Sequence, residues 1–309
     1  MSTKPQPTCV WHEGELEVQQ LAGVRREADD LAGMYRRAVE PGMVGFLAQQ
    51  RFAVATTVDQ QARTWTSLIA GEPGMLAIPD PTVVKVNAAR IESALPLDNL
   101  AKNSKLGMLV IDFARRIRVR INGEAEAQPD GSVLLSIRQL YGNCAQYIQR
   151  RTVIATATPQ PEKQAAITGD ELTQDQADLI RKSDTFFLGS VHAESGADAS
   201  HRGGLPGFVQ VHDSKNISFP DYSGNNMFNT LGNVAINPSV GLLFFDFESG
   251  RALALTGKAT VDWADARARE LPAAKRVIDV EVEEVRDTPA ATSLRYRFEA
   301  FSPFLTQEK

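Results

Sequence analysis

Residues 103–123 read NSKLGMLVIDFARRIRVRING, and residues 237–257 read NPSVGLLFFDFESGRALALTG. The two stretches share a glycine, an Asp-Phe pair and a closing glycine at one constant spacing. That spacing is 134 residues, as from Gly107 to Gly241 (241 minus 107). Aligned glycines with matching apolar runs indicate an internal duplication, and self-similarity of this kind bears on the whole fold.

Strand-like segments make up most of both copies. Residues 51–58 (RFAVATTV) and 133–137 (VLLSI) are apolar and rich in residues that favour strands. Residues 276–286 alternate apolar and charged side chains, as a strand with one solvated face does. Many short strands, with one short helix inserted at residues 225–236, indicate an antiparallel barrel in each half.

The domain organisation follows from the duplication, since two copies are too few for a solenoid. We predict a mainly β chain with some helix: an N-terminal helical segment over residues 1–40, a first, diverged barrel over residues 41–160, and a second barrel over residues 161–309. In residues 16–37, apolar side chains recur every three or four positions, which predicts one amphipathic helix ended by Pro41.

Two segments between the predicted strands have their own patterns. Residues 138–151 (RQLYGNCAQYIQRR) read as a helix interrupted by Gly142. Arg116, Arg118 and Arg120 alternate with apolar residues, so we expect these arginines to lie mostly on a solvated strand face.

Composition excludes several classes of protein. The chain has 309 residues, of which 43% are hydrophobic and 23% are charged, so it has enough apolar surface to fold. Its net charge is −5 and it has no basic arm, so nucleic acid is not expected as a partner. No apolar run is long enough to cross a membrane, and residues 1–15 lack the apolar core of a secretion signal.

The cysteines and histidines predict no metal site. Cys9 and Cys144 are too few for a disulfide framework or a cysteine cluster, which fits a reducing, cytoplasmic setting. The four histidines form no HExxH motif. Glycine-rich nucleotide motifs and the GxSxG elbow are also absent from the sequence.

One part of the second half has specific motifs over most of residues 175–262. The motifs are SHRGG at residues 200–204, FPDYSGNN at residues 219–226, the pair Asn237-Pro238, the strand end Asp246-Phe247, and the following Gly250-Arg251. With them the segment resembles the pyridoxamine 5'-phosphate oxidase-like family of FMN-binding split barrels. The first half, as the diverged copy, is similar in outline, so the resemblance implies two tandem split β-barrels in one chain.

The resemblance implies that FMN lies in a groove between two barrels, with its phosphate held by basic and hydroxyl side chains. Arg202 offers a planar fork suited to phosphate, and glycines let a backbone approach a ligand. The start of the inserted helix favours an anion. The candidate cofactor-binding residues are Ser200, His201, Arg202, Gly203, Gly204, Ser223, Asn225 and Asn226. No catalytic residue and no metal ligand is assigned.

The second half departs from the family pattern at one place. The family usually has Arg or Lys near the positions of Asn225 and Asn226, which are neutral amides here. Lys215 and His201 are the candidates to supply the missing charge. The oxidation of pyridoxamine phosphate itself is therefore not expected, and a shared fold does not transmit a substrate.

The first half departs further. Aligning the Pro-Gly pairs of the two halves places Ile69 against Arg202, so the first copy is expected to have lost its own phosphate site. It would then form the partner wall of the groove. Trp65 has two readings there, as a ring stacked on the flavin or as core filling.

The leading hypothesis is an FMN-binding flavoprotein, an oxidoreductase acting on an unidentified small molecule, with the groove formed by a homodimer or an internal pseudo-dimer. The alternative is a non-catalytic binding protein that holds haem, a deazaflavin or another ligand in the same groove. Haem would need an axial ligand, for which His192, His201 and His212 are the candidates. A third reading is a regulatory or assembly partner without a ligand.

Overall fold

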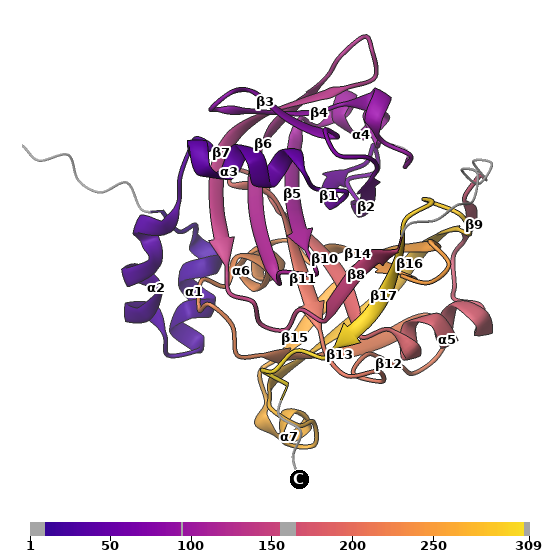
Figure 1. The fold of residues 1–309 in the computed structure, drawn as a ribbon. Coiled ribbons are helices and arrows are strands. Elements are labelled where there is room, and N and C mark those ends of the chain that lie inside the picture. Colours follow the sequence, from indigo (N-terminus) through magenta and orange to yellow (C-terminus); the bar gives the residue numbers. More distant parts are fainter. Residues whose placement is uncertain (1–9, 94, 155–164, 306–309) are drawn as a thin grey trace, which may run out of the picture.

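Two antiparallel sheets with the same strand order form the body of the protein (Figure 1). The computed structural model describes residues 10–93, 95–154 and 165–305. The first sheet has the order β2-β1-β5-β6-β7-β4-β3, and the second has the order β11-β10-β14-β15-β16-β13-β12. Counting along each copy, these are the same order, so the mainly β fold with two tandem split barrels is confirmed.

The strands of the first sheet are β1 (Phe52–Val58), β2 (Thr64–Ala70), β3 (Leu76–Asp80), β4 (Val83–Val86), β5 (Lys105–Asp112), β6 (Ile117–Ala127) and β7 (Val133–Asn143). Those of the second are β10 (Thr185–His192), β11 (Gly196–Gly203), β12 (Gln210–Val211), β13 (Asn216–Tyr222), β14 (Ser239–Phe245), β15 (Ala252–Asp262) and β16 (Ala274–Thr288), with β9 (Ile167–Gly169) pairing with β16.

Strand register repeats between the copies at the spacing seen in the sequence. Gly107 of β5 pairs with Asn122 of β6 in the first sheet, and Gly241 of β14 pairs with Thr256 of β15 in the second. A bulge precedes Gly123 in β6, and an equivalent bulge precedes Gly257 in β15. A β-bulge is a specific irregularity, so its repetition at the same place supports common descent of the two halves.

Short helices accompany the sheets. They are α1 (Glu13–Leu21), α2 (Arg25–Leu31), α3 (Pro41–Ala48), α4 (Leu97–Lys102), α5 (Gln174–Lys182), α6 (Asn229–Ile236) and α7 (Asp265–Arg269), with 3-10 turns at Ala32–Met34 and Ala88–Arg90. α4 precedes β5 in the first copy, as α6 precedes β14 in the second. The predicted boundary between residues 160 and 161 lies outside the described residues, as does Cys9.

Two predicted helices are wrong. Residues 16–37 form two α-helices and a 3-10 turn, because Gly23 takes a left-handed φ of 70° that ends the first helix. Pro41 begins α3, where its missing N–H costs nothing. Most of residues 138–151 belongs to β7 and to β8 (Arg150–Ile154), since β7 pairs with β6 up to Asn143 and this long-range ladder overrides local helical spacing.

Glycines let the two sheets approach each other closely. A Cβ on Gly107 would lie 2.6 Å from the backbone of Ala197 and Asp198, and a Cβ on Gly241 would lie 2.6 Å from the backbone N of Thr66. Contacts this short require a side chain to be absent. The two glycines are equivalent in the duplication, so the halves contact each other through a pseudo-twofold pair of contacts.

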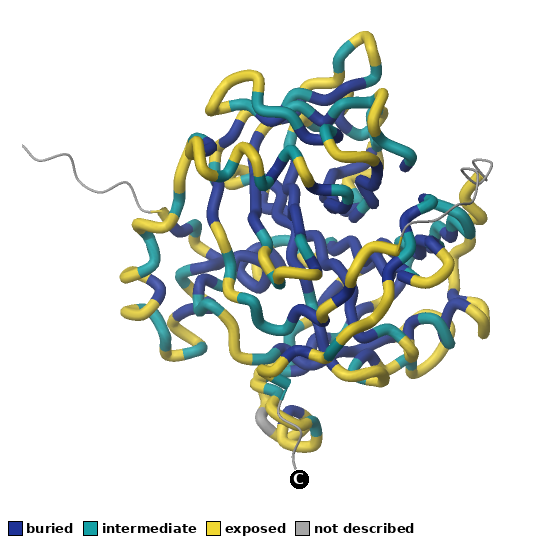
Figure 2. The backbone as a smooth tube through the Cα atoms, viewed as in Figure 1, coloured by how far each residue is buried: buried dark blue, intermediate teal, exposed yellow. Residues whose placement is uncertain are grey.

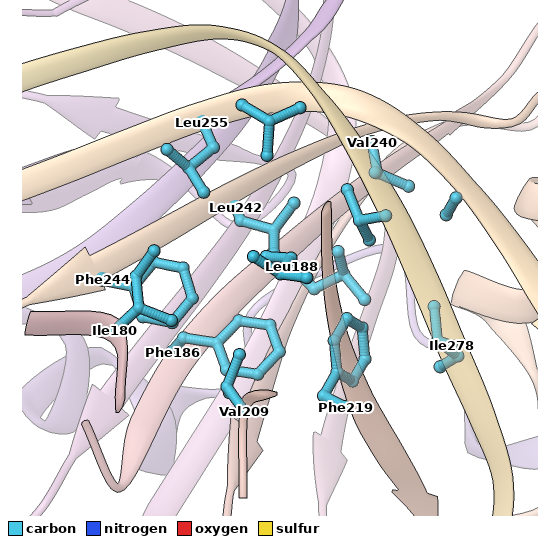
Figure 3. Packing of buried hydrophobic residues seen from close by; sticks show 14 of the residues in the cluster. Ile180, Phe186, Leu188, Val209, Phe219, Val240, Leu242, Phe244, Leu255 and Ile278 are labelled. Carbon is cyan, nitrogen blue, oxygen red and sulfur yellow. The ribbon is translucent and has the colours of Figure 1, made fainter. Parts of the chain in front are cut away.

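Apolar side chains fill the space inside and between the sheets. In Figure 2 the strands at the centre of the molecule are coloured as buried. Figure 3 shows the core of the second barrel, in which Phe186, Leu188, Leu242 and Phe244 pack together. A separate cluster joins the halves; its aromatic members are Phe52, Phe113, Phe187, Phe245, Phe247 and Tyr296. Buried aromatic rings contribute large apolar areas, so this cluster stabilises the contact between the copies.

Two further contacts tie distant parts of the chain together. β8 pairs with β17 (Arg295–Ala300), which brings the middle of the chain beside its C-terminal part (Figure 1). α1 packs on α6, where a Cβ on Gly14 would lie 2.1 Å from the carbonyl oxygen of Gly232. In the described residues, no helix has the length and apolarity needed to cross a membrane.

Replacing either contact glycine should destabilise the protein. We expect Gly107→Ala and Gly241→Ala each to lower the free energy of unfolding by about 1–3 kcal/mol, because the added methyl group meets backbone atoms. Gly142→Ala is the matched control, since Gly142 also lies in a strand and a Cβ there meets nothing within 4 Å. Urea unfolding followed by fluorescence measures all three, and equal losses in all three variants would contradict this explanation.

Candidate functional site

A cleft of about 400 Å³ lies between the two halves of the molecule. The first half contributes Arg118 and Arg120 from β6, and the connection from β7 to β8 contributes residues such as Cys144 and Tyr147. The second half contributes β11, the end of β13, the start of α6, and Lys275 and Arg276 of β16. The volume is in the range of small-molecule sites.

Seven of the eight predicted site residues line this cleft: Ser200, His201, Arg202, Gly203, Ser223, Asn225 and Asn226. The exception is Gly204, where a Cβ would lie 2.3 Å from the ring of Phe208. At Gly203 a Cβ would lie 2.2 Å from the carbonyl oxygen of Tyr147. Both glycines therefore make room for protein atoms, which is a different reason from the close ligand approach expected from the sequence.

Arg202 and Arg276 share one carboxylate. Arg202 Nη1 lies 2.7 Å from Asp221 Oδ1, and Arg276 Nη1 lies 2.7 Å from Asp221 Oδ2. The rings of Phe228 and Trp263 lie 4.9 and 4.7 Å from the Arg276 guanidinium carbon. One buried aspartate thus orders two arginines along the cleft and balances only one of their charges.

Arg118 and Arg120 are among the site residues that sequence reasoning missed. The prediction that they lie on a solvated strand face is wrong: Arg120 is buried, Arg118 is partly buried, and the apolar Ile117 is exposed. The face of β6 that carries the arginines points toward the second half, which a single strand pattern does not reveal. The sequence signal that could have pointed to these residues was the alternation of three arginines along one strand of a duplicated chain.

The two β6 arginines differ in their partners. Arg120 donates to both carboxylate oxygens of the buried Asp198, at 3.1 and 3.0 Å, and Asp198 keeps the pKa of Arg120 above its ordinary value although burial opposes this. Arg118 contacts no carboxylate in the described part of the chain. Burial, followed by repulsion from Arg120 and Arg202, lowers the pKa of Arg118 to about 9. An anion beside Arg118 would relieve that repulsion.

The tautomer of His201 follows from its contact with Arg118. Arg118 Nη1 lies 3.2 Å from His201 Nδ1, and a guanidinium only donates, so Nδ1 accepts and Nε2 carries the proton. That Nε2 is buried and has no hydrogen-bond partner among the described residues. Burial and then the charge of Arg118 hold the pKa of His201 well below its usual 6.5, so the ring is neutral at pH 7.

The start of α6 opens on the cleft. Asn229, Thr230 and Leu231 line it, and the first N–H groups of a helix have no partners within the helix. Thr230 Oγ1 lies 3.3 Å from the hydroxyl of Ser200, whose own proton points to the carbonyl of Leu188 at 3.2 Å. The helix end and two hydroxyl groups thus lie close together on one wall, an arrangement that suits an anion.

Side-chain hydrogen bonds of Asn225 hold the loop before α6 in place. Asn225 donates from Nδ2 to Asn143 Oδ1 at 2.8 Å and accepts from the N–H of Met227 at 3.2 Å, so it joins the two halves. Asn226 has a left-handed φ of 60°, which asparagine tolerates better than most residues. Ser223 is exposed, and its carbonyl accepts from the hydroxyl of Tyr147 at 2.9 Å.

The N-terminal segment stabilises the same wall. Asn229 donates to Glu15 Oε1 at 2.6 Å and to the hydroxyl of Tyr35 at 2.8 Å. Burial raises the pKa of Glu15 to about 7. Ala22 and Val24, in the turn after α1, reach the cleft itself. The N-terminal segment is therefore part of the site, a role that its sequence pattern did not indicate.

Positive charge exceeds negative charge in the cleft. Five cationic side chains line it: Arg118, Arg120, Arg202, Lys275 and Arg276. Two carboxylates contact them within the described residues, those of Asp198 and Asp221. The Nε atoms of all four arginines are buried, and none has a hydrogen-bond partner in the described part of the chain. The donor set therefore fits a dianion such as a phosphate ester.

The missing charge near Asn225 is supplied from other strands. Arg118 of β6 and Lys275 and Arg276 of β16 lie in the cleft, whereas Lys215 lies outside it, 3.8 Å from Asp170. Sequence comparison with the family motif considers only aligned positions, so it overlooks cations that reach the same space from elsewhere.

The first half has no equivalent arginine. Strand pairing places Ala70 of β2 opposite Phe52, as Arg202 of β11 is opposite Phe186, so Ala70 and not Ile69 occupies the position of Arg202. The alignment was one residue out because it was anchored on the Pro-Gly pairs: Pro206 follows Arg202 by four positions, whereas Pro73 follows Ala70 by three.

Trp65 is core filling between the halves, and it does not line the cleft. It is buried, donates from Nε1 to Asp59 Oδ2 at 2.9 Å, and stacks against the guanidinium of Arg286, 3.7 Å from its ring centroid. Of its two readings, the structure therefore favours packing.

One of the three candidate axial histidines lines the cleft, namely His201. His212 contacts Ser218 at 2.8 Å, and His192 lies 3.1 Å from Glu13 and stacks on His12. Backbone N–H groups point at Nδ1 of both His12 and His192, so each Nε2 carries a proton. This pair is therefore arranged for hydrogen bonding, with no ring nitrogen free for a metal ion.

Acid should destabilise the protein through His201. The unfolded chain takes up a proton near pH 6.5 and the folded chain does not, so the free energy of unfolding should fall as the pH falls below about 6.5, by up to about 1.4 kcal/mol per pH unit. His201→Gln should flatten this dependence, whereas His212→Gln, a change at a histidine outside the cleft, should not. Urea unfolding between pH 7.5 and 5 tests this, and parallel curves for wild type and His201→Gln would refute it.

Comparison with known proteins identifies relatives of the second half. Residues 172–302 match the family model described as pyridoxamine 5'-phosphate oxidase. No protein with a curated description matches the chain.

Solved structures resemble parts of the chain. HupZ from Group A Streptococcus is 18% identical, with 39% of this chain and 97% of that one covered and a TM-score of 0.32. A Clostridium acetobutylicum protein related to general stress protein 26, of the pyridoxinephosphate oxidase family, is 14% identical, with coverages of 40% and 92% and a TM-score of 0.29. An F420 reductase is 11% identical, with coverages of 38% and 99% and a TM-score of 0.28. Because these TM-scores are low, the assignment rests on the family model, and it confirms over residues 172–302 that the chain carries a pyridoxamine 5'-phosphate oxidase-like segment.

Proposed function

We propose that the chain binds FMN non-covalently in the cleft between its two halves. The observation that carries this proposal is the cationic cluster around Arg118, Arg202 and Arg276, whose buried Nε groups have no hydrogen-bond partner among the described residues. The phosphate would contact these arginines, with the start of α6 and the hydroxyl of Ser200 on the same wall. The predicted residues Gly203, Ser223, Asn225 and Asn226 would complete the site, while His201 would donate from Nε2.

The proposed activity is the oxidation or reduction of a small molecule. A bound flavin would supply hydride-transfer chemistry, and the protein would supply position and electrostatics. The excess positive charge would also stabilise negative charge on the bound ring system. His201 is neutral with a strongly lowered pKa, so it serves as a hydrogen-bond donor and is poorly suited to accept a proton.

One internal groove would serve each chain. The two halves already form the contact that two subunits would otherwise supply, as an internal pseudo-dimer. A homodimer of such chains would cover exposed strand edges, and we keep it as part of the proposal. The cytoplasmic setting likewise remains a proposal from the sequence.

Removing the predicted phosphate ligand should weaken FMN binding. We expect Arg202→Ala to cost about 1.5–3 kcal/mol, the range for hydrogen bonds to charged groups, or roughly 10-fold to 150-fold in Kd. Quenching of flavin fluorescence on titration with protein measures it. Lys215→Ala is the matched control, because that cation lies outside the cleft. An unchanged Kd for Arg202→Ala would remove this residue from the site.

The proposed stoichiometry is one FMN per chain. The duplication implies a second place, related to the cleft by exchanging the two halves, and alanines stand there where the cleft has arginines. Ala70 corresponds to Arg202, and Ala252 and Ala254 correspond to Arg118 and Arg120. A dianion bound there would lack the three arginines that these alanines replace. The protein is reconstituted with FMN and desalted, and the amounts of FMN and protein are measured from the flavin and peptide absorbances. The molar ratio of FMN to protein should be one, and a ratio of two would contradict the loss of the first site.

Haem is the second candidate ligand, with His201 as the cleft-lining candidate for its axial ligand. The geometry disfavours it, because Arg118 donates to Nδ1 of His201 and so leaves the proton on Nε2, the nitrogen that would have to bind iron. A Soret band on haem titration that disappears in His201→Gln would support haem. The arginine cluster favours FMN, because haem brings carboxylates rather than a phosphate dianion.

A further inference from the structure

A second cavity, of about 510 Å³, lies away from the cleft. It is bounded by the β8–β17 ribbon and by the end of the second sheet at which β10 begins and β14 ends. Five aromatic side chains line it: Phe245, Phe247, Tyr296, Phe298 and Phe301. Phe298 and Phe301 remain substantially exposed, with ring centroids 4.7 Å apart. We call this space the aromatic cavity.

Two side chains that line the aromatic cavity each have a buried polar atom without a hydrogen-bond partner in the part of the chain that the structure describes. Arg151 Nη1 and Thr185 Oγ1 are both buried, and neither has a hydrogen-bond partner among the described residues. The exposed fraction is 6% for Arg151 and 1% for Thr185. A buried donor without an acceptor costs free energy, so two such side chains lining one cavity favour a ligand that accepts hydrogen bonds.

The charge of Arg151 is already balanced. Its Nη2 donates to both carboxylate oxygens of Asp184, at 2.5 and 2.6 Å, and its guanidinium carbon lies 4.0 Å from the centroid of the Phe247 ring. At the rim, Lys182 is opposed by Asp246 and Glu248. The lining therefore has one more negative than positive group, which disfavours a carboxylate or phosphate ligand.

The walls of the aromatic cavity are anchored. Gln149 donates to the carbonyls of Gly204 and Asp184, at 2.8 and 3.2 Å, and accepts from the N–H of Ser302 at 2.7 Å. Arg116 donates to the carbonyl of Phe301 at 2.9 Å. These bonds fix the end of β17 and the following turn against the second sheet, so the cavity is preformed.

We propose that the aromatic cavity binds an uncharged aromatic molecule that carries a carbonyl group, such as an aryl amide. The carbonyl oxygen accepts from Arg151 Nη1 and the Thr185 hydroxyl, and the ring packs beside Phe298 and Phe301. The site lies outside the proposed flavin groove and does not depend on flavin binding. Nothing in it places a reacting group, so its role is binding.

The test uses 4-fluorobenzamide as the probe and ¹⁹F NMR titration of the full chain, with and without FMN. We expect saturable binding in both conditions. Thr185→Val keeps the shape of the side chain and removes the free hydroxyl, and Phe298→Ala removes an exposed ring. Each should weaken binding about fivefold or more. Phe304→Ala is the matched control, an aromatic residue of similar exposure that does not line the cavity.

Three outcomes would overturn the proposal. The first is no saturable binding of 4-fluorobenzamide. The second is an unchanged Kd in Thr185→Val, which is the variant least disturbing to the fold. The third is tighter binding of 4-fluorobenzoate than of the amide, which would contradict the uncharged ligand. Weaker binding of the benzoate, together with an unchanged Phe304→Ala, supports it.

Discussion

The close approach of the two halves at Gly107 and Gly241 is the constraint on which the rest of the structure depends. At these positions the backbone of each half lies where a Cβ would have to be. The contact brings β11 of the second half beside β5 and β6 of the first. Without it, Arg118 and Arg120 would face solvent, and the cleft would have only one wall.

The electrostatics of the cleft follow from that contact. Arg120 is neutralised by Asp198 across the two halves, whereas Arg118 contacts only a neutral histidine there. Because burial strengthens both attraction and repulsion between charges, the unbalanced arginines create a site suited to an anion. The same low polarity keeps His201 neutral and fixes which of its nitrogens donates.

Duplication has produced two unlike sites from two like sheets. The strand order and the bulges before Gly123 and Gly257 are retained in both copies. Ala70 of β2 stands at the position that Arg202 has in β11. A pseudo-symmetric frame can thus keep one functional groove, while the other side of the contact serves packing.

Several features were predictable because they depend on local spacing or on repeated motifs. The sequence by itself determined the duplication, the mainly β architecture, the motifs of the second half and seven residues of the cleft. Helix boundaries failed at residues 16–37 and 138–151, because Gly23 and the pairing of β6 with β7 override the apolar periodicity. Only the tertiary structure decided that Arg118, Arg276 and the turn after α1 meet at one place, and that Lys215 does not. The physical reason is that alternation along a strand tells two faces apart but does not tell which face the other half of the chain will cover.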